Sequence, residues 1–201
     1  MRNFAQIISI VFQPLFLPLY GIILLLNLPI YQYYYTIGQK LFILFGVALF
    51  TAIVPALVIL CLIKTKKVKD YFIDDKAERT IPYIICFFCY LLCAVFLWMV
   101  NLNLWIVRVM LGVSISLICM IMINFSWKIS AHMSGMGGFC GAVFAGALLV
   151  NANPVGLFVC VILLSGIVAS CRIYLKEHTL AQTFAGFCLG FCCTFFPALL
   201  W

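Results

Sequence analysis

The chain contains two histidines, His132 and His178, and each lies near hydroxyl and basic side chains. A neutral imidazole is a nucleophile and a protonated imidazole is a proton donor, so a pair of histidines is able to divide the two roles of a group-transfer reaction. Position alone is equally consistent with two polar residues at a membrane interface. The neighbouring sequence therefore has to distinguish these two interpretations.

The spacing around His178 is found in a known family. Arg172 is followed after five residues by His178, after three more by Gln182, and then by an Ala-Gly pair. This pattern resembles the third motif of the type 2 phosphatidic acid phosphatase superfamily, in which Ser-Arg precedes His by the same spacing and Asp follows the His. In this chain Cys171 replaces the serine and Gln182 replaces the aspartate.

The segment before His132 resembles the second motif of that superfamily, Pro-Ser-Gly-His. Ser130 and His132 match the motif, whereas Ile129 and Ala131 stand at its proline and glycine positions. A hydrophobic hairpin separates the two motifs in this chain, as it does in the family. The order of the motifs and the topology between them thus agree with the resemblance.

The first motif of the family, Lys followed after six residues by Arg-Pro, is only partly present. Arg79 matches the arginine, but Phe72 stands at the lysine position and Pro82 comes two residues late. The missing lysine has two candidate substitutes, Lys76 and Lys128. The resemblance covers roughly residues 64–190 of a single membrane domain that spans residues 1–201.

The resemblance implies a metal-independent lipid phosphatase that acts through a phosphohistidine. His178 would attack phosphorus, His132 would protonate the leaving alkoxide, and Gln182 would orient His178. Fixed positive charge and hydrogen-bond donors would hold the phosphoryl oxygens. The phosphate-binding residues implied in this way are Arg172, Arg79, Lys128, Ser130 and Lys76.

The amide at position 182 is the main departure from the family. An amide oxygen accepts the imidazole N–H bond, but it supplies no charge to stabilise an imidazolium. The expectation is therefore either a slower phosphoric monoester or diphosphate hydrolase or a relative without activity. The substrate is expected to be a lipid phosphate or diphosphate, with no cofactor and no nucleic-acid partner. Which lipid is hydrolysed does not follow from these motifs.

A glycine-rich segment, residues 134–138, follows the second motif. If it begins a helix, its backbone N–H groups would face an anion. Close packing of small residues between membrane helices explains the same composition equally well.

The elements that must position these residues are membrane helices. The chain is 67% hydrophobic and 8% charged, whereas soluble domains carry about 25% charged residues. Backbone groups inside hydrocarbon must be hydrogen-bonded within the protein, and the apolar runs are too long for barrel strands, so an all-α transmembrane bundle of about six to seven helices is predicted. The expected spans are 4–27, 40–63, 81–100, 104–126, 137–151, 155–171 and 180–200.

With alternate crossings, most cations fall on the face that carries both histidines. The positive-inside rule predicts that this face is cytoplasmic and that the protein is a multi-pass protein of the cell (inner) membrane. Only Lys40 and Arg108 lie on or near the other face. The cations of the histidine-bearing face are Arg2, Lys64, Lys66, Lys67, Lys69, Lys76, Arg79, Lys128, Arg172 and Lys176.

The composition also bears on other functional classes. A metal-dependent prenyltransferase or phosphotransferase needs two carboxylate clusters, and of the five acidic residues only Glu177 lies in the second half of the chain. Most of the 11 cysteines lie in apolar runs and lack the spacing of a zinc site. A non-catalytic membrane protein that binds or transports a lipid phosphate or another anion remains the alternative.

Overall fold

The protein is an all-α, multi-pass membrane protein. The computed structural model describes residues 1–28, 33–66, 68–69 and 77–200, and these residues form helices and turns without strands. Six helical segments of this described part are long and apolar enough to cross a membrane. The first comprises α4 (Ile37–Ala48), η1 (Leu49–Ile53) and α5 (Val54–Lys64), and the others are α6 (Thr80–Met99), α7 (Leu104–Ser126), α8 (Ala131–Leu149), α9 (Val155–Tyr174) and α10 (Leu180–Leu199).

The first expected span, 4–27, is wrong as a single helix. The chain forms α1 (Arg2–Val11) and α2 (Leu17–Leu26), separated by a short break that contains Pro14. Pro14 has no N–H to continue the helical ladder, and its ring disfavours helical geometry at the preceding residue. In contrast, Pro18 lies in the first turn of α2, where an N–H is not needed.

The helical segment formed by α4, η1 and α5 contains a π-helical turn in its middle. Thr36 and Gln39 form a capping box at the start of α4. The helix opens into the π-helical turn η1, which ends at Ile53, two residues before Pro55. Pro55 has no N–H to donate to the preceding turn. The crossing continues to Lys64, so the expected span 40–63 was nearly correct.

The fifth span begins earlier than expected. Residue 137 was the predicted start, but α8 begins at Ala131, where the Ser130 hydroxyl accepts a hydrogen bond from the Met133 N–H. His132 therefore lies in the first turn of a helix and not in a loop. The glycine-rich segment lies inside this helix, so most of its N–H groups are used in the helical ladder.

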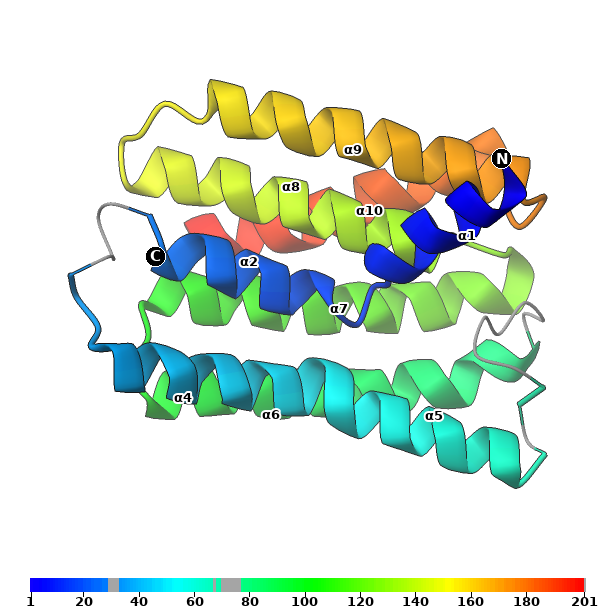
Figure 1. The fold of residues 1–201 in the computed structure, drawn as a ribbon, viewed down its shortest axis with the longest axis horizontal. Coiled ribbons are helices and arrows are strands. Elements are labelled where there is room, and N and C mark those ends of the chain that lie inside the picture. Colours follow the sequence, from blue (N-terminus) through cyan, green and yellow to red (C-terminus); the bar gives the residue numbers. More distant parts are fainter. Residues whose placement is uncertain (29–32, 67, 70–76, 201) are drawn as a thin grey trace.

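The helices run side by side along one long axis, and the loops gather at the two ends of the bundle (Figure 1). The N-terminus and the α7–α8 and α9–α10 connections lie at one end. The α6–α7 and α8–α9 connections lie at the other end, and α1 and α2 follow each other along the bundle. The end with the N-terminus therefore brings together the beginning of α8, the end of α9 and the beginning of α10.

Small residues allow α8 and α10 to pack closely. A Cβ atom built on Gly137 would lie 2.0 Å from the Phe187 carbonyl oxygen, and one built on Gly190 would lie 1.8 Å from the Ser134 carbonyl oxygen. Glycine is required at both contacts because any side chain would collide with backbone. Of the two interpretations of the glycine-rich segment, close packing describes Gly137.

Candidate functional site

Four of the predicted site residues line one cavity at the N-terminal end of the bundle. His132 lies in the first turn of α8, His178 immediately precedes α10, Arg172 is in the last turn of α9, and Arg79 immediately precedes α6. Segments separated by up to a hundred residues therefore contribute to a single site. Lys76, another of the predicted phosphate-binding cations, lies outside the described residues.

All four side chains are buried. The exposed fraction is 2% for Arg172, 4% for Arg79, 8% for His132 and 6% for His178. A buried guanidinium is expensive unless oxygen acceptors or an anion offset the loss of water. Two such groups line this cavity, so its end near the N-terminus carries positive charge.

Arg79 connects two loops of the site. Its Nη1 donates a hydrogen bond of 3.2 Å to the carbonyl oxygen of Ile129. Ile129 belongs to the short connection between α7 and α8, immediately before the Ser130 cap. The start of α6 is thus fastened to the segment that positions His132.

Glu177 lies between two of the predicted phosphate-binding cations. Its Oε2 is 3.7 Å from the Lys128 Nζ and 3.9 Å from the Arg172 Nη2. Residues 127–130 are not helical, so Lys128 does not lie one helical turn before His132. Glu177 therefore brings Lys128 and Arg172 together through a shared carboxylate.

The expected partner of His178 is in place. Its Nδ1 lies 3.1 Å from the Gln182 Oε1, and the Thr179 N–H donates to the same oxygen at 3.1 Å. Thr179 and Gln182 also form a capping box at the start of α10. Because the amide oxygen can only accept, Nδ1 carries the proton and Nε2 presents its lone pair.

His178 is held in its neutral form. Burial lowers its pKa to about 3, and the positive charges of Arg79, Arg172 and Lys128 act in the same direction. The hydrogen bond with Gln182 opposes this shift but does not cancel it. At neutral pH the ring is therefore an uncharged imidazole with an available lone pair, as a nucleophile requires.

His132 has a partner that no motif indicated. Its Nε2 lies 3.0 Å from the carbonyl oxygen of Ser9, near the end of α1. A carbonyl accepts, so Nε2 carries the proton and Nδ1 has the lone pair in the neutral ring. The Gln13 N–H bonds to the Ile10 carbonyl instead of the Ser9 carbonyl, because the helix ends there.

The backbone N–H of Ser130 connects the segment around His132 to the segment around His178. The Ser130 hydroxyl caps α8, and the N–H lies 3.4 Å from the Gln182 carbonyl oxygen. The side chain is fully buried. Ser130 thus fixes the start of α8 against the start of α10, and with it the relative placement of the two imidazoles.

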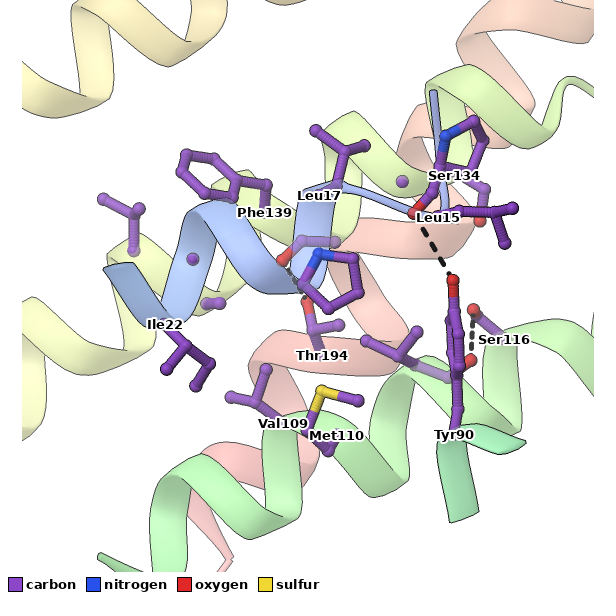
Figure 2. A pocket seen from close by; sticks show the side chains of 18 of the residues that line it. Leu15, Leu17, Ile22, Tyr90, Val109, Met110, Ser116, Ser134, Phe139 and Thr194 are labelled. Atoms are coloured by element: carbon purple, nitrogen blue, oxygen red, sulfur yellow. Dashed lines mark hydrogen bonds between the residues drawn. The ribbon is translucent and has the colours of Figure 1, made fainter. Parts of the chain in front are cut away.

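The cavity continues away from these polar groups between α2, α6, α7 and α8, with a volume of about 370 Å³. Its middle is lined by apolar side chains such as Ile22, Val109, Met110 and Phe139 (Figure 2). The Tyr90 hydroxyl donates to the Pro14 carbonyl oxygen at 3.4 Å and fastens the α1–α2 break to α6. The site therefore has a cationic end and a long apolar body.

Sequence reasoning missed Ser9, Glu177 and the role of the α1–α2 break. Glu177 carried a usable signal, because a lone carboxylate between Arg172 and His178 in an apolar half of the chain is expected to pair with a cation. Ser9 carried none, since its contribution is a backbone carbonyl. Comparisons of the chain with protein-family models, with curated proteins and with solved structures find no match.

Proposed function

We propose that this protein is a membrane lipid phosphatase that hydrolyses a lipid phosphate or diphosphate through a phosphohistidine intermediate. The observation that carries the proposal is that the buried side chains of four residues line one cavity: His132, His178, Arg79 and Arg172. Their sequence motifs resemble those of the type 2 phosphatidic acid phosphatases. Two imidazoles and two guanidinium groups around one cavity suit phosphoryl transfer, and this supports the proposal.

The first step would transfer the phosphoryl group to His178. Its Nε2 lone pair attacks phosphorus, and the bond between phosphorus and the lipid oxygen breaks. His132, which takes up a proton when the anionic phosphate binds, gives that proton to the departing alkoxide. For a diphosphate, the leaving group is the lipid monophosphate. Arg79 and Arg172 bind the phosphoryl oxygens, whose charge increases as the transfer proceeds.

The second step would regenerate the enzyme. Water attacks the phosphohistidine, neutral His132 accepts the proton of that water, and the bond between phosphorus and the His178 nitrogen breaks. Inorganic phosphate leaves, and both imidazoles return to their initial states. In this scheme Arg79, Arg172 and Lys128 supply the positive charge without a metal ion.

Phosphate release by purified protein tests the proposal. The substrates are phosphatidate, phosphatidylglycerophosphate, a polyprenyl diphosphate and a lipid A phosphate, in detergent and in EDTA. Activity should persist in EDTA, be inhibited by vanadate and be lost in His178→Ala. Arg2→Gln, which alters an exposed cation of α1, is the matched control and should retain activity.

The opposite results would support other classes. Activity that requires Mg²⁺ would indicate a metal-dependent enzyme. Vanadate or phosphate binding without turnover on any substrate would favour the non-catalytic alternative. The Arg108 guanidinium, which lies within a span, donates to the Leu200 carbonyl oxygen at the end of α10, and this structural bond gives little support to a carrier with a charged site in the membrane.

A further inference from the structure

Tyr83 lies one helical turn after Arg79 and lines the same cavity. Residues four apart lie on the same face of a helix, and both side chains are buried, with exposed fractions of 9% for Tyr83 and 4% for Arg79. His132, His178 and Arg172 line this cavity as well. Tyr83 therefore belongs to the cationic end of the site, although no sequence motif indicated it.

The Tyr83 hydroxyl is hydrogen-bonded to the Arg79 side chain. A guanidinium only donates, so the tyrosine oxygen accepts this bond and its O–H is available to donate to another group. Arg79 also donates through Nη1 to the Ile129 carbonyl oxygen at 3.2 Å. These two bonds hold the guanidinium and the phenol next to each other at the wall of the cavity.

Within the part of the chain that the structure describes, the Tyr83 O–H has no acceptor. Tyr90, two turns further along α6, differs in this respect. It lines the same cavity, but its hydroxyl donates to the Pro14 carbonyl oxygen at 3.4 Å (Figure 2). A buried O–H without an acceptor is costly, and an oxygen of a bound anion would supply one. Of these two tyrosines, Tyr83 is therefore the one suited to bind a ligand.

The surroundings of the Tyr83 hydroxyl favour an anionic acceptor. Arg79 and Arg172 place positive charge at this end of the cavity, and hydrogen bonds to charged oxygens are stronger than those to neutral ones. Because Arg79 donates to the tyrosine oxygen, the O–H is polarised and becomes a better donor. We propose that Tyr83 is a phosphate-binding residue, whose hydroxyl donates to a phosphoryl oxygen while its own oxygen accepts from Arg79. This inference rests on the proposed phosphatase function and adds a residue to its site.

Vanadate binding to the native protein and to Tyr83→Phe tests the proposal. The substitution removes only the hydroxyl, and the dissociation constant should rise about tenfold or more, because a hydrogen bond to a charged group accounts for that factor. Unfolding temperatures over a range of vanadate concentrations give the constants. Tyr83→Leu also removes the hydroxyl and replaces the first variant if that one does not fold. Equal vanadate affinity with and without the hydroxyl, or no vanadate binding to the native protein, would overturn the proposal.

Tyr90→Phe is the matched control for this measurement. It removes a buried hydroxyl from the same helix and the same cavity, but one that already has an acceptor in the protein. Its vanadate affinity should equal that of the native protein. A loss as large as that of Tyr83→Phe would show that any buried hydroxyl of α6 has this effect, and the assignment of Tyr83 would fail.

The Arg79→Gln background separates a direct contact from an effect through Arg79. If the Tyr83 hydroxyl itself contacts the anion, Tyr83→Phe should weaken vanadate binding further in Arg79→Gln. If the hydroxyl only positioned the guanidinium, the second substitution would change nothing in that background. The latter result would reject Tyr83 as a phosphate ligand.

Turnover distinguishes failure of this proposal from failure of the phosphatase function. On the lipid phosphate that the native protein hydrolyses fastest, Tyr83→Phe should lower kcat/KM about tenfold or more. Weaker vanadate binding in Tyr83→Phe, with no turnover of any lipid by the native protein, would retain Tyr83 as an anion ligand and reject the phosphatase. Turnover with the same kcat/KM and the same vanadate affinity in Tyr83→Phe would retain the phosphatase and reject the role of Tyr83.

Discussion

At the scale of single residues, Gln182 combines two tasks in one atom. Its Oε1 accepts from His178 Nδ1 and from the Thr179 N–H, so the residue orients the imidazole and caps α10. The amide thereby fixes the tautomer of His178 without supplying charge. Substitutions at position 182 can distinguish the orientation of His178 from the capping of α10.

We predict that Gln182→Ala lowers turnover with little effect on KM, because a misoriented nucleophile binds substrate but attacks less often. The lost cap should also reduce the free energy of unfolding by about 1 kcal/mol. Gln182→Glu keeps the reach to both donors and adds the missing charge, which should raise the pKa of His178 and increase turnover. Steady-state kinetics and thermal unfolding of the three proteins check this. Activity that is insensitive to both substitutions would remove His178 as the nucleophile.

The Glu177 carboxylate lies beside two of the cations that are predicted to bind phosphate. It is within 4 Å of Lys128 and of Arg172. A phosphate that binds these cations has to compete with the carboxylate for them. Glu177 is therefore expected to stabilise the empty site and to weaken anion binding.

We predict that Glu177→Gln lowers the free energy of unfolding, measured without added ligand, by an amount on the order of 1–3 kcal/mol. The reason is that the buried Arg172 loses a charged partner. Vanadate or phosphate should restore more stability in this variant than in the native protein, since tighter binding adds more stabilisation. Unfolding temperatures measured over a range of vanadate concentrations test both statements. Weaker vanadate binding in Glu177→Gln would show that the carboxylate supports the anion site instead of competing for it.

At the scale of elements, the break between α1 and α2 determines the surroundings of His132. Because α1 ends after Val11, the Ser9 carbonyl is directed to the imidazole Nε2. In an unbroken helix the Gln13 N–H would bond to that carbonyl. The helix break thus creates a hydrogen-bond acceptor for a predicted catalytic side chain.

We predict that Pro14→Ala favours a continuous helix through the break and weakens the bond between Ser9 and His132. The ¹⁵N chemical shifts of the imidazole should then show a changed tautomer population, and turnover should fall severalfold. Pro18→Ala is the matched control, because Pro18 lies in the first turn of α2, where proline is tolerated. Unchanged ¹⁵N shifts in Pro14→Ala would show that the break does not control the ring.

At the scale of the whole molecule, the candidate site lies at the same end of the bundle as the N-terminus and the α7–α8 and α9–α10 connections. The positive-inside rule favours a cytoplasmic position for this end. Arg79 and Arg172, however, are buried in the site, and placement for ligand binding accounts for them as well as placement for insertion does. The orientation therefore has to be measured.

We predict that a single cysteine at Thr65 is protected from an impermeant thiol reagent in intact cells and is labelled after permeabilisation. A cysteine at Ala152, in the α8–α9 connection at the other end, should be labelled in intact cells. Both positions are exposed, and both variants are made in a background without the native cysteines. Labelling with the two positions exchanged would place the site on the outer side of the membrane.

The sequence by itself determined the features that depend on composition and on local hydrogen bonding. The low charge and long apolar runs require transmembrane helices, because unpaired backbone groups are too costly in hydrocarbon. The spacing from Arg172 through His178 to Gln182 predicted a contact that the structure contains, because a capping box and a four-residue separation act within one turn. The hydropathy pattern did not predict the helix break at Pro14. Hydropathy is averaged over a window of residues and does not depend on whether a backbone N–H is missing.

Only the tertiary structure decided which distant groups meet. The Ser9 carbonyl at His132 and the meeting of Lys128 and Arg172 at Glu177 depend on where separate helices end against one another. The cavity has the same origin, because its walls come from helices whose separation is set by side-chain volumes and by glycine contacts such as that of Gly137 with Phe187. Local sequence patterns determine the individual helices. A cavity and its charge arise from the packing of several helices at once, and that packing is not a property of any one segment.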